Sequence, residues 1–306
     1  MKHLKNFTFS ILFLALAISA SGQATPDTPI KAAPAAQVSV STQELKLASK
    51  LMAREMPYKL IVPDGYAAAA NKSKRYAVIY LLHGLGGHYD NWTARTKLAE
   101  YALKYQYIIV TPEGNNGWYT DSATVRDDKY ESYIVQELIP EIDVKFRTLA
   151  NRENRVVAGL SMGGYGALKF GLKYPDKFVL AGSFSGALGA AGWTLKGLEE
   201  NNIRSGAIFD SIKAAFGADD SPTRAENDIF KMIREMTPEK TKTLPMLYVD
   251  CGTEDFLVIR GNREFGNLLF DKKIPHEFRI LPGAHDWRFW DNSVKEFLEL
   301  SQKVIK

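Results

Sequence analysis

Short apolar runs alternate with longer amphipathic stretches along most of this chain. The short runs are rich in β-branched and aromatic residues, and several are apolar throughout, as in strands covered on both faces. They predict strands at 58–62, 76–82, 107–111, 155–159, 178–184, 246–251 and 277–281. The longer stretches repeat apolar residues at helical spacing and predict helices at 92–105, 130–146, 162–173, 261–272 and 292–304. This alternation predicts an α/β fold with a mainly parallel sheet and helices on both faces.

One stretch, 186–243, interrupts the alternation because it contains no strand-like run. It begins with a Gly/Ala-rich loop and continues with helical patterns near 210–216 and 225–236. A helical insertion between two strands is well placed to cover a pocket at the carboxyl edge of the sheet, where ligands bind in open α/β folds. Its large aromatic residues either line that pocket or pack the insertion onto the sheet. They are Trp193, Phe209, Phe216 and Phe230.

The first 24 residues have the charged, apolar and small-residue order of a secretory signal peptide. The apolar run, 7–18, is about a dozen residues long, whereas a permanent transmembrane helix needs roughly 20. We therefore expect cleavage near Gly22 or Ala24 and an exported protein, periplasmic or secreted, without a stable membrane anchor. The Pro/Ala-rich stretch 25–43 predicts a flexible tether, followed by a single folded domain at 44–306.

Composition and charge narrow the classes of partner. The chain has 306 residues, of which 45% are hydrophobic and 11% aromatic, so it can bury a large core and is not a disordered protein. The formal charge of +4 falls to +2 when Lys2 and Lys5 leave with the leader, and no dense basic run predicts nucleic-acid binding. Cys251 is the only cysteine, which excludes an intrachain disulfide. The oligomeric state is not indicated by the sequence.

The motif G-x-S-x-G occurs at 159–163, with Ser161 at its centre. It follows the predicted strand 155–159 and precedes the predicted helix 162–173, which is the context of a nucleophile elbow. Such a turn strains the serine and projects its hydroxyl above the sheet edge, at a helix N-terminus where the dipole favours negative charge. We therefore predict that Ser161 is a nucleophile rather than a simple helix cap.

A serine hydroxyl becomes strongly nucleophilic only when a base removes its proton, so a histidine is needed further along the chain. His276 follows Pro275 at the start of a predicted strand, whereas His285 lies in a turn after the last predicted strand. A loop at the carboxyl end of a strand can reach the serine. His285 is therefore the predicted base.

The third member of a triad is a carboxylate that lies between the serine and the histidine in the chain. Asp250 lies at the end of the predicted strand 246–251, and Asp255 lies in the loop beyond it. The loop position favours Asp255, with Asp250 and then Glu254 as alternatives. The acid fixes the imidazole tautomer and stabilises its positive charge.

An oxyanion hole requires two backbone donors. Met162, the residue after the nucleophile, supplies one N–H, and the loop after an early strand supplies the other. The segment 82–87 occupies that position, and Leu85 is the predicted donor. His83 in this segment is expected to be a structural hydrogen-bonding residue rather than a second base.

His83, His88 and Asp90 are residue types that bind metals, and they lie close together in the sequence. Their spacing matches no zinc pattern, so we expect no metal site.

Five parts of the chain resemble the family known as putative esterases, or the esterase D family, within the α/β-hydrolases. They are 81–87, 112–115 with Trp118 and Tyr119, 159–166, 251–257, and 285–287 with Trp290. The most specific run is 159–167, G-L-S-M-G-G-Y-G-A. Together they span almost the whole chain after the tether. Members of this family include S-formylglutathione hydrolases, tributyrin-type and feruloyl esterases, and mycolyltransferases.

The resemblance implies a triad and an oxyanion hole at the residues already singled out, Ser161, Asp255 and His285 with Leu85 and Met162. It also implies that a metal or organic cofactor is not needed.

The loop bearing Trp118 and Tyr119 would by resemblance border the substrate pocket. From the residues alone, both side chains are explained equally well as a packed anchor of that loop.

We expect an exported serine carboxylesterase that hydrolyses short-chain or aromatic acyl esters, such as acetyl or feruloyl groups on carbohydrates, through an acyl-enzyme. The leader departs from the cytosolic S-formylglutathione hydrolases, so a glutathione thioester is not the expected substrate. One alternative is an acyltransferase to a sugar hydroxyl, which forms the same acyl-enzyme. Another is a non-catalytic carbohydrate-binding relative, which would lack a triad member, but none is missing.

Overall fold

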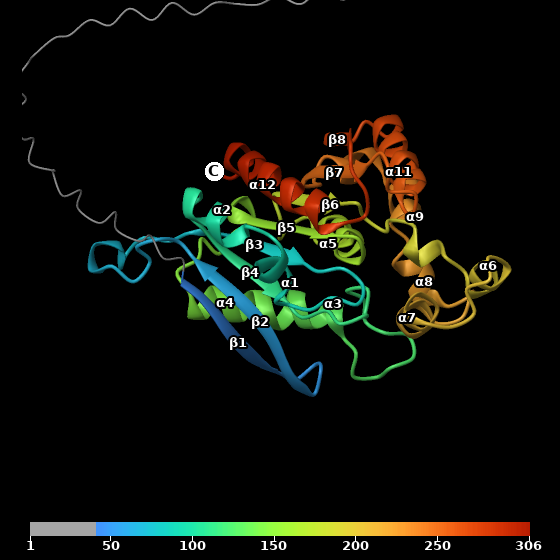
Figure 1. Cartoon of the computed structure of the whole chain (residues 1–306), viewed down its shortest axis with the longest axis horizontal. Coiled ribbons are helices and arrows are strands. Elements are labelled where there is room, and N and C mark those ends of the chain that lie inside the picture. The colour runs from blue at the N-terminus through green and yellow to red at the C-terminus, as the bar shows by residue number, and fades with distance from the viewer. Residues whose placement is uncertain (1–40) are drawn as a thin grey trace, which may run out of the picture. The chain divides into compact units, whose positions relative to one another are not determined.

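The computed structural model describes residues 41–306, which form an eight-stranded sheet with helices on both faces (Figure 1). The strands are β1 Ser41–Ser49, β2 Arg54–Val62, β3 Ala77–Leu82, β4 Tyr107–Pro112, β5 Arg155–Leu160, β6 Leu180–Phe184, β7 Met246–Gly252 and β8 His276–Leu281. Their order across the sheet is β1-β2-β4-β3-β5-β6-β7-β8. The strands from β3 to β8 are parallel, which confirms the predicted α/β class.

The edge strand β1 differs from the sequence prediction, which placed the tether up to residue 43. It pairs antiparallel with β2 along its whole length, from Ser41 opposite Val62 to Ser49 opposite Arg54. Only Leu45 and Leu47 contribute large apolar side chains to the core from this mostly polar strand, so its pattern is weak. The predicted signal peptide, and the predicted tether up to residue 40, lie outside the described residues.

Helices enclose the sheet on both sides. They are α1 Asn91–Arg95, α2 Leu98–Lys104, α3 Tyr130–Ser132, α4 Ile139–Lys145, α5 Met162–Lys173, α6 Leu195–Glu200, α7 Ala207–Phe216, α8 Pro222–Glu226, α9 Ile229–Arg234, α10 Pro238–Thr241, α11 Ile259–Asp271 and α12 Trp287–Val304. Figure 1 shows α2 and α12 on one side of the sheet and α4 on the other. Two buried apolar clusters correspond to these faces, one containing Trp92 and Phe297 and the other Tyr165 and Phe265.

Two predicted helices are interrupted in the structure. The helix predicted at 92–105 is split into α1 and α2, because Thr96 is extended and the next amide, Lys97 N–H, donates to Asp291 Oδ1 at 2.7 Å. The helix predicted at 130–146 contains a π-helical turn, Tyr133–Leu138, between α3 and α4. Pro140 follows this turn and has no N–H to continue the α-helical hydrogen-bond ladder.

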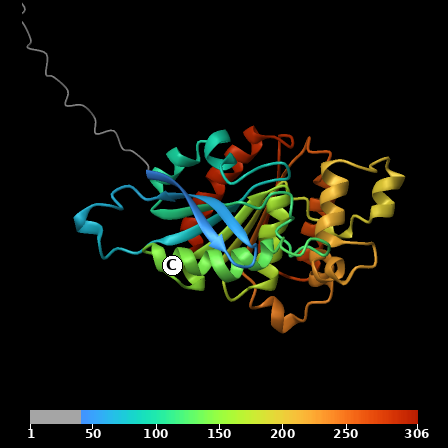
Figure 2. The same ribbon diagram turned by 90° about the horizontal axis from the view of Figure 1, so that it is seen from below.

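The insertion predicted at 186–243 is helical and carries α6 to α10. These helices gather at one end of the described residues, as both ribbon views show (Figures 1 and 2). Within residues 41–306 no helix combines the length and the apolar character that crossing a membrane requires.

Candidate active site

The turn after β5 places Ser161 in a conformation that side chains rarely adopt, with φ 52° and ψ −116°. Both flanking glycines are required by close backbone contacts. A Cβ atom on Gly159 would lie 2.5 Å from Gly163 O, and a Cβ atom on Gly163 would lie 2.4 Å from Leu82 O. The strained turn is held by Ser161 N–H, which donates to Phe184 O at 3.0 Å. Ser161 therefore occupies a nucleophile elbow in front of α5.

Ser161, His285 and Asp255 form one hydrogen-bonded chain. Ser161 Oγ lies 3.0 Å from His285 Nε2, and His285 Nδ1 lies 2.7 Å from Asp255 Oδ2. The Asp255 side chain is fully buried and the His285 side chain is about one quarter exposed, with 23% of its surface accessible. A carboxylate that accepts from Nδ1–H leaves Nε2 free to accept the serine proton.

The loops that carry the acid and the histidine are fastened to each other by backbone contacts. Glu254 N–H donates to Gly283 O at 2.9 Å, and a Cβ atom on Gly252 would lie 2.2 Å from the same oxygen. The ring of Trp290, from α12, stands edge-on to the His285 imidazole at a centroid distance of 4.9 Å. These contacts restrict the movement of the imidazole.

The alternatives considered for the base and the acid lie elsewhere. His276 is at the amino end of β8, the opposite sheet edge from Ser161, where its Nδ1 lies 2.7 Å from Ile274 O. Asp250 is fully buried in β7 and accepts a hydrogen bond from Tyr248 Oη at 2.9 Å. Glu254 places its backbone, rather than its carboxylate, against the histidine loop.

The loop after β3 passes directly beside the serine. A Cβ atom on Gly84 would lie 3.4 Å from Ser161 Cβ, and Leu85 lines the same two cavities as Ser161. Gly86 N–H donates to Asn116 Oδ1 at 2.8 Å, and Gly87 N–H donates to Gly84 O at 3.0 Å. The Leu85 amide between these bonded positions finds no acceptor among residues 41–306.

A family model described as "Putative esterase" matches residues 49–299. This chain belongs to that esterase family. An acetyl esterase of Caldicellulosiruptor saccharolyticus is 31% identical to this chain over 232 residues, which cover 76% of this chain and 85% of the acetyl esterase. The resemblance seen in the sequence is therefore confirmed.

Solved structures of esterases and serine hydrolases share the fold. A ferulic acid esterase has a TM-score of 0.72 and 26% identity, covering 87% of this chain and 99% of its own. The fluorophosphonate-binding serine hydrolase FphF of Staphylococcus aureus has a TM-score of 0.75 and 25% identity, covering 86% of this chain and 98% of its own. The esterase thus has the α/β-hydrolase fold and hydrolase activity on esters.

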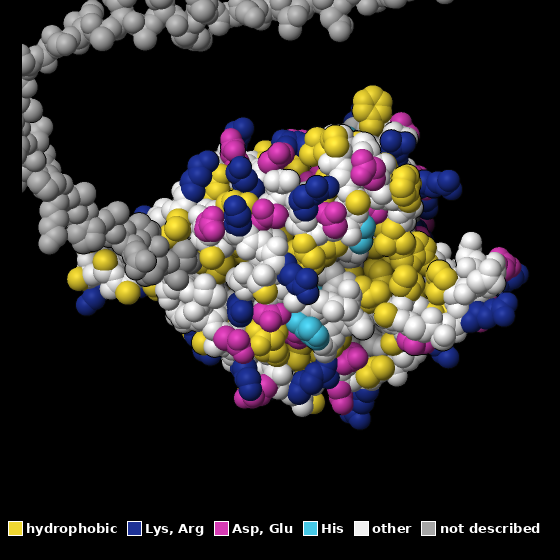
Figure 3. Space-filling model, viewed as in Figure 1, with side chains coloured by type: hydrophobic (Ala, Val, Ile, Leu, Met, Phe, Trp, Pro, Cys, Tyr) yellow, Lys and Arg dark blue, Asp and Glu magenta, His cyan; other side chains and the backbone are white. Residues whose placement is uncertain are grey.

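A largely apolar cavity of about 680 Å³ opens from Ser161 toward the insertion. It is lined by residues of the insertion and of neighbouring loops, among them Trp118, Ala187, Trp193, Leu198, Ile203, Ile208, Phe256 and Leu257. Phe256 and Leu257, next to Asp255, are mostly exposed at 85% and 59%. In Figure 3, hydrophobic side chains gather on this side of the esterase, beside the helices of the insertion.

The two aromatic residues expected at the pocket occupy different places. Trp118 lines the apolar cavity, and its Nε1–H donates to Ser211 Oγ of α7 at 3.0 Å. Tyr119 is fully buried and donates its hydroxyl hydrogen to His83 O at 3.0 Å. Both residues have positive φ angles, 52° and 50°, so adjacent side chains diverge from one strained turn. The geometry of Tyr119 is that of a loop anchor beneath the site.

Of the aromatic residues in the insertion, only one of the four lines the apolar cavity. That residue is Trp193. Phe216 and Phe230 are buried in the core cluster, and Phe209 packs against it. These three rings pack the insertion into the core together with its buried aliphatic side chains, such as Ile212 and Ile229.

His83 and Glu113 support the loop from below. His83 is buried, with Nδ1 2.8 Å from Gly84 O and Nε2 3.1 Å from Glu113 Oε1. Burial favours a raised pKa for Glu113, but hydrogen bonds from His83 and from the amides of Asn115 and Tyr89 lower its pKa to about 2. Residues 41–306 contain no group of three or more metal-binding side chains placed to hold an ion.

Burial raises the pKa of Asp250 to about 7, far above its ordinary value of 3.8. The folded esterase therefore binds this proton more tightly than the unfolded chain, and its unfolding free energy falls as pH rises between these values. Asp250→Asn removes the titration. We expect the stability of the variant relative to the natural protein to increase by about 1.4 kcal/mol per pH unit in this window and to level off above it. Urea unfolding at pH 5, 6, 7 and 8 measures this; a pH-independent difference would contradict it.

Proposed function

We propose that the protein is an exported serine carboxylesterase that hydrolyses short-chain or aromatic acyl esters of carbohydrates. The observation that carries this proposal is the hydrogen-bonded chain from Ser161 through His285 to Asp255, at the mouth of an apolar cavity. Export is supported by the order of residues in the leader.

In the first step Ser161 Oγ attacks the ester carbonyl while His285 Nε2 takes the hydroxyl proton. The Asp255 carboxylate stabilises the resulting imidazolium. The imidazolium then donates this proton to the leaving alcohol oxygen, and the serine is left acylated. Water then attacks the acyl carbonyl while His285 removes its proton, and the acid is released when the imidazolium returns this proton to Ser161 Oγ.

The carbonyl oxygen gains negative charge in both steps and needs donors that are already in place. Met162 N–H is in the first turn of α5, where amides have no partner inside the helix. Leu85 N–H lies in the adjacent loop, beside Ser161. We assign the oxyanion hole to these two amides. The N-terminus of α5 adds a favourable dipole.

The position of His285 indicates on which side of Ser161 the alcohol and the acyl group of the ester bind. The leaving oxygen must be within reach of the imidazole, so the alcohol lies on the His285 side of Ser161. A cavity of about 240 Å³ on that side is lined by His285, Trp287 and Arg95 together with the turn at 84–87. The acyl group consequently occupies the apolar cavity of the insertion, where Trp118 and Trp193 provide aromatic surfaces.

The experiment is an assay of purified protein on p-nitrophenyl acetate, p-nitrophenyl butyrate and methyl ferulate, with and without a sugar acceptor. We expect release of free acid from acetyl or feruloyl esters and labelling of Ser161 by a fluorophosphonate. Acylated sugar as the main product would identify an acyltransferase. Absence of both turnover and labelling would contradict the proposal and favour a non-catalytic binding protein.

A further inference from the structure

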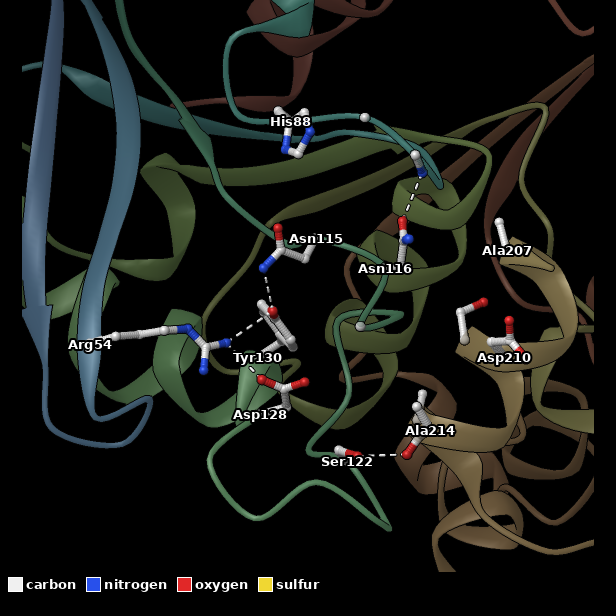
Figure 4. A pocket seen from close by; sticks show the side chains of 15 residues that line it. Arg54, His88, Asn115, Asn116, Ser122, Asp128, Tyr130, Ala207, Asp210 and Ala214 are labelled. Atoms are coloured by element: carbon white, nitrogen blue, oxygen red, sulfur yellow. Dashed lines mark hydrogen bonds and ion pairs between the residues drawn. The ribbon is translucent and has the colours of Figure 1, made fainter.

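A third cavity, of about 650 Å³, lies across the Gly86–Gly87 turn from the His285 side of the site. Figure 4 shows its walls: Arg54 at the start of β2, the loop from Asn115 to Tyr130, and α7 of the insertion opposite them. In contrast to the apolar cavity, its labelled side chains are mostly polar. We call it the polar cavity.

The charges of the polar cavity largely cancel. Arg54 Nη2 lies 2.7 Å from Asp128 Oδ1 and donates to Tyr130 Oη at 3.0 Å, so this guanidinium is already engaged. The remaining carboxylate of the lining, Asp210, has no ion-pair partner within residues 41–306 and accepts from Gly206 N–H. A phosphate or carboxylate would find no unpaired arginine or lysine in this lining. The electrostatics therefore disfavour an anionic ligand.

The polar cavity offers donors and acceptors in close succession. Asn116 uses Oδ1 to accept from Gly86 N–H, and Asn115 uses Nδ2 to donate to Tyr130 Oη at 2.7 Å. The other halves of both carboxamides, Asn116 Nδ2 and Asn115 Oδ1, have no partner among the described residues. Asp210 uses Oδ2 for Gly206 N–H at 3.1 Å and keeps a second oxygen. Vicinal hydroxyl groups, each both donor and acceptor, match such a set.

Two glycines form part of the wall between this cavity and the active site. Gly86 and Gly87 line both the polar cavity and the smaller cavity that contains Ser161 and His285. A Cβ atom on Gly86, whose φ is +71°, would meet nothing within 4 Å, whereas a Cβ atom on Gly87 would lie 2.6 Å from Asn91 Oδ1. The space beside Gly86 is therefore open. A chain that leaves the His285 side can cross this turn toward α7.

We propose that the polar cavity is a subsite for sugar residues of the alcohol, one or more units away from the sugar that carries the ester. This rests on the proposed function, because it places the alcohol on the His285 side. The substrate class is then an acylated oligosaccharide rather than a simple alkyl ester. The subsite also contacts the oxyanion loop, since Asn116 bonds Gly86 next to Leu85.

The test fills the polar cavity with a tryptophan on its far wall. Ala207, exposed in the first turn of α7, lines the cavity, and Lys213 on the same helix is exposed and lies outside it. The variants are Ala207→Trp and, as a matched control, Lys213→Trp. Substrates are p-nitrophenyl acetate and acetylated xylo-, manno- and cello-oligosaccharides, which all share the acetyl group. The acyl side of the site is therefore constant.

We expect Ala207→Trp to lower kcat/KM on at least one oligosaccharide by about tenfold or more, because hydrogen bonds to the sugar are lost, while p-nitrophenyl acetate changes less than about twofold. Lys213→Trp leaves both unchanged. Equal behaviour of the two variants on every oligosaccharide would overturn the subsite.

Calorimetric titration of unesterified tetrasaccharides into both variants and the natural protein measures the subsite without catalysis. If Ala207→Trp weakens tetrasaccharide binding and Lys213→Trp does not, the subsite is supported. This conclusion holds even if Ala207→Trp slows the hydrolysis of all esters equally. No difference in binding overturns it. Failure of the proposed function is distinct, because p-nitrophenyl acetate would then not be hydrolysed by any of the three proteins.

Discussion

Ser161→Ala is expected to lower kcat on p-nitrophenyl acetate by about 10⁶-fold, as loss of the nucleophile does in other serine hydrolases. Alanine has no hydroxyl to form the acyl-enzyme, so only binding and the oxyanion donors remain. Steady-state and burst kinetics at saturating ester measure the effect. The burst of p-nitrophenol should disappear together with turnover.

Another serine at the carboxyl edge of the sheet provides the control for this substitution. Ser185 follows β6, is fully buried, and like Ser161 has a positive φ angle, here 46°. Ser185→Ala should therefore still be labelled by a fluorophosphonate, which phosphonylates the serine oxygen with loss of fluoride, whereas Ser161→Ala should not be labelled. Labelling of Ser161→Ala at the natural rate would show that another residue is the nucleophile.

Asp255→Asn is expected to lower kcat by about 10⁴-fold while the protein remains folded. The natural carboxylate accepts from His285 Nδ1–H at 2.7 Å. A carboxamide that turns its NH₂ group toward Nδ1 favours the opposite tautomer, in which Nε2 carries the hydrogen and cannot accept the serine proton. The pH–rate profile of the variant checks this, since residual activity should rise with hydroxide concentration.

The neighbouring carboxylate supplies a matched control for this change. Glu254 is exposed, and only its backbone contacts the histidine loop. Glu254→Gln should keep kcat within about threefold, because charges at exposed positions are screened by solvent. If Glu254→Gln were as damaging as Asp255→Asn, the acid would be assigned wrongly.

The hydrogen-bonded chain at the site was accessible from sequence because each member follows a strand of a parallel sheet. Ser161 follows β5, Asp255 follows β7 and His285 follows β8, and the carboxyl ends of parallel strands share one edge. Chain order left Asp250 and Asp255 as candidates, and the choice depended on which carboxylate can reach the histidine. In the structure Asp255 Oδ2 lies 2.7 Å from His285 Nδ1. The hydrophobic pattern and the positions of the loops are therefore sufficient to predict Ser161, Asp255 and His285.

Features that depend on distant contacts were not accessible. The edge strand β1 is stabilised by its pairing with β2, and Glu137 of the π-helical turn accepts from the amides of Lys50 and Leu51 at its end. Trp118 and Tyr119 lie on a turn with two consecutive positive φ angles, which neither residue type favours. Local propensity cannot predict a conformation that tertiary contacts impose.

The polar cavity was missed for a related reason. Its walls come from β2, from the loop before α3 and from α7, and no short motif joins them. Nothing in the sequence distinguishes Arg54 and Asp128 from the other charged residues. Only the fold brings Arg54 Nη2 within 2.7 Å of Asp128 Oδ1.

The helices α6 to α10 contribute none of the three members of the hydrogen-bonded chain, although they lie between Ser161 and Asp255 in the sequence. Ser161 is held by Phe184 O at the end of β6 and by Ala187 N–H, which donates to Ser161 O at 3.0 Å, and the loops that carry Asp255 and His285 are held by each other. Evolution can therefore change the helices α6 to α10 to suit a different substrate while Ser161, Asp255 and His285 keep their positions. Transplanting this segment between relatives is a direct route to altered substrate preference.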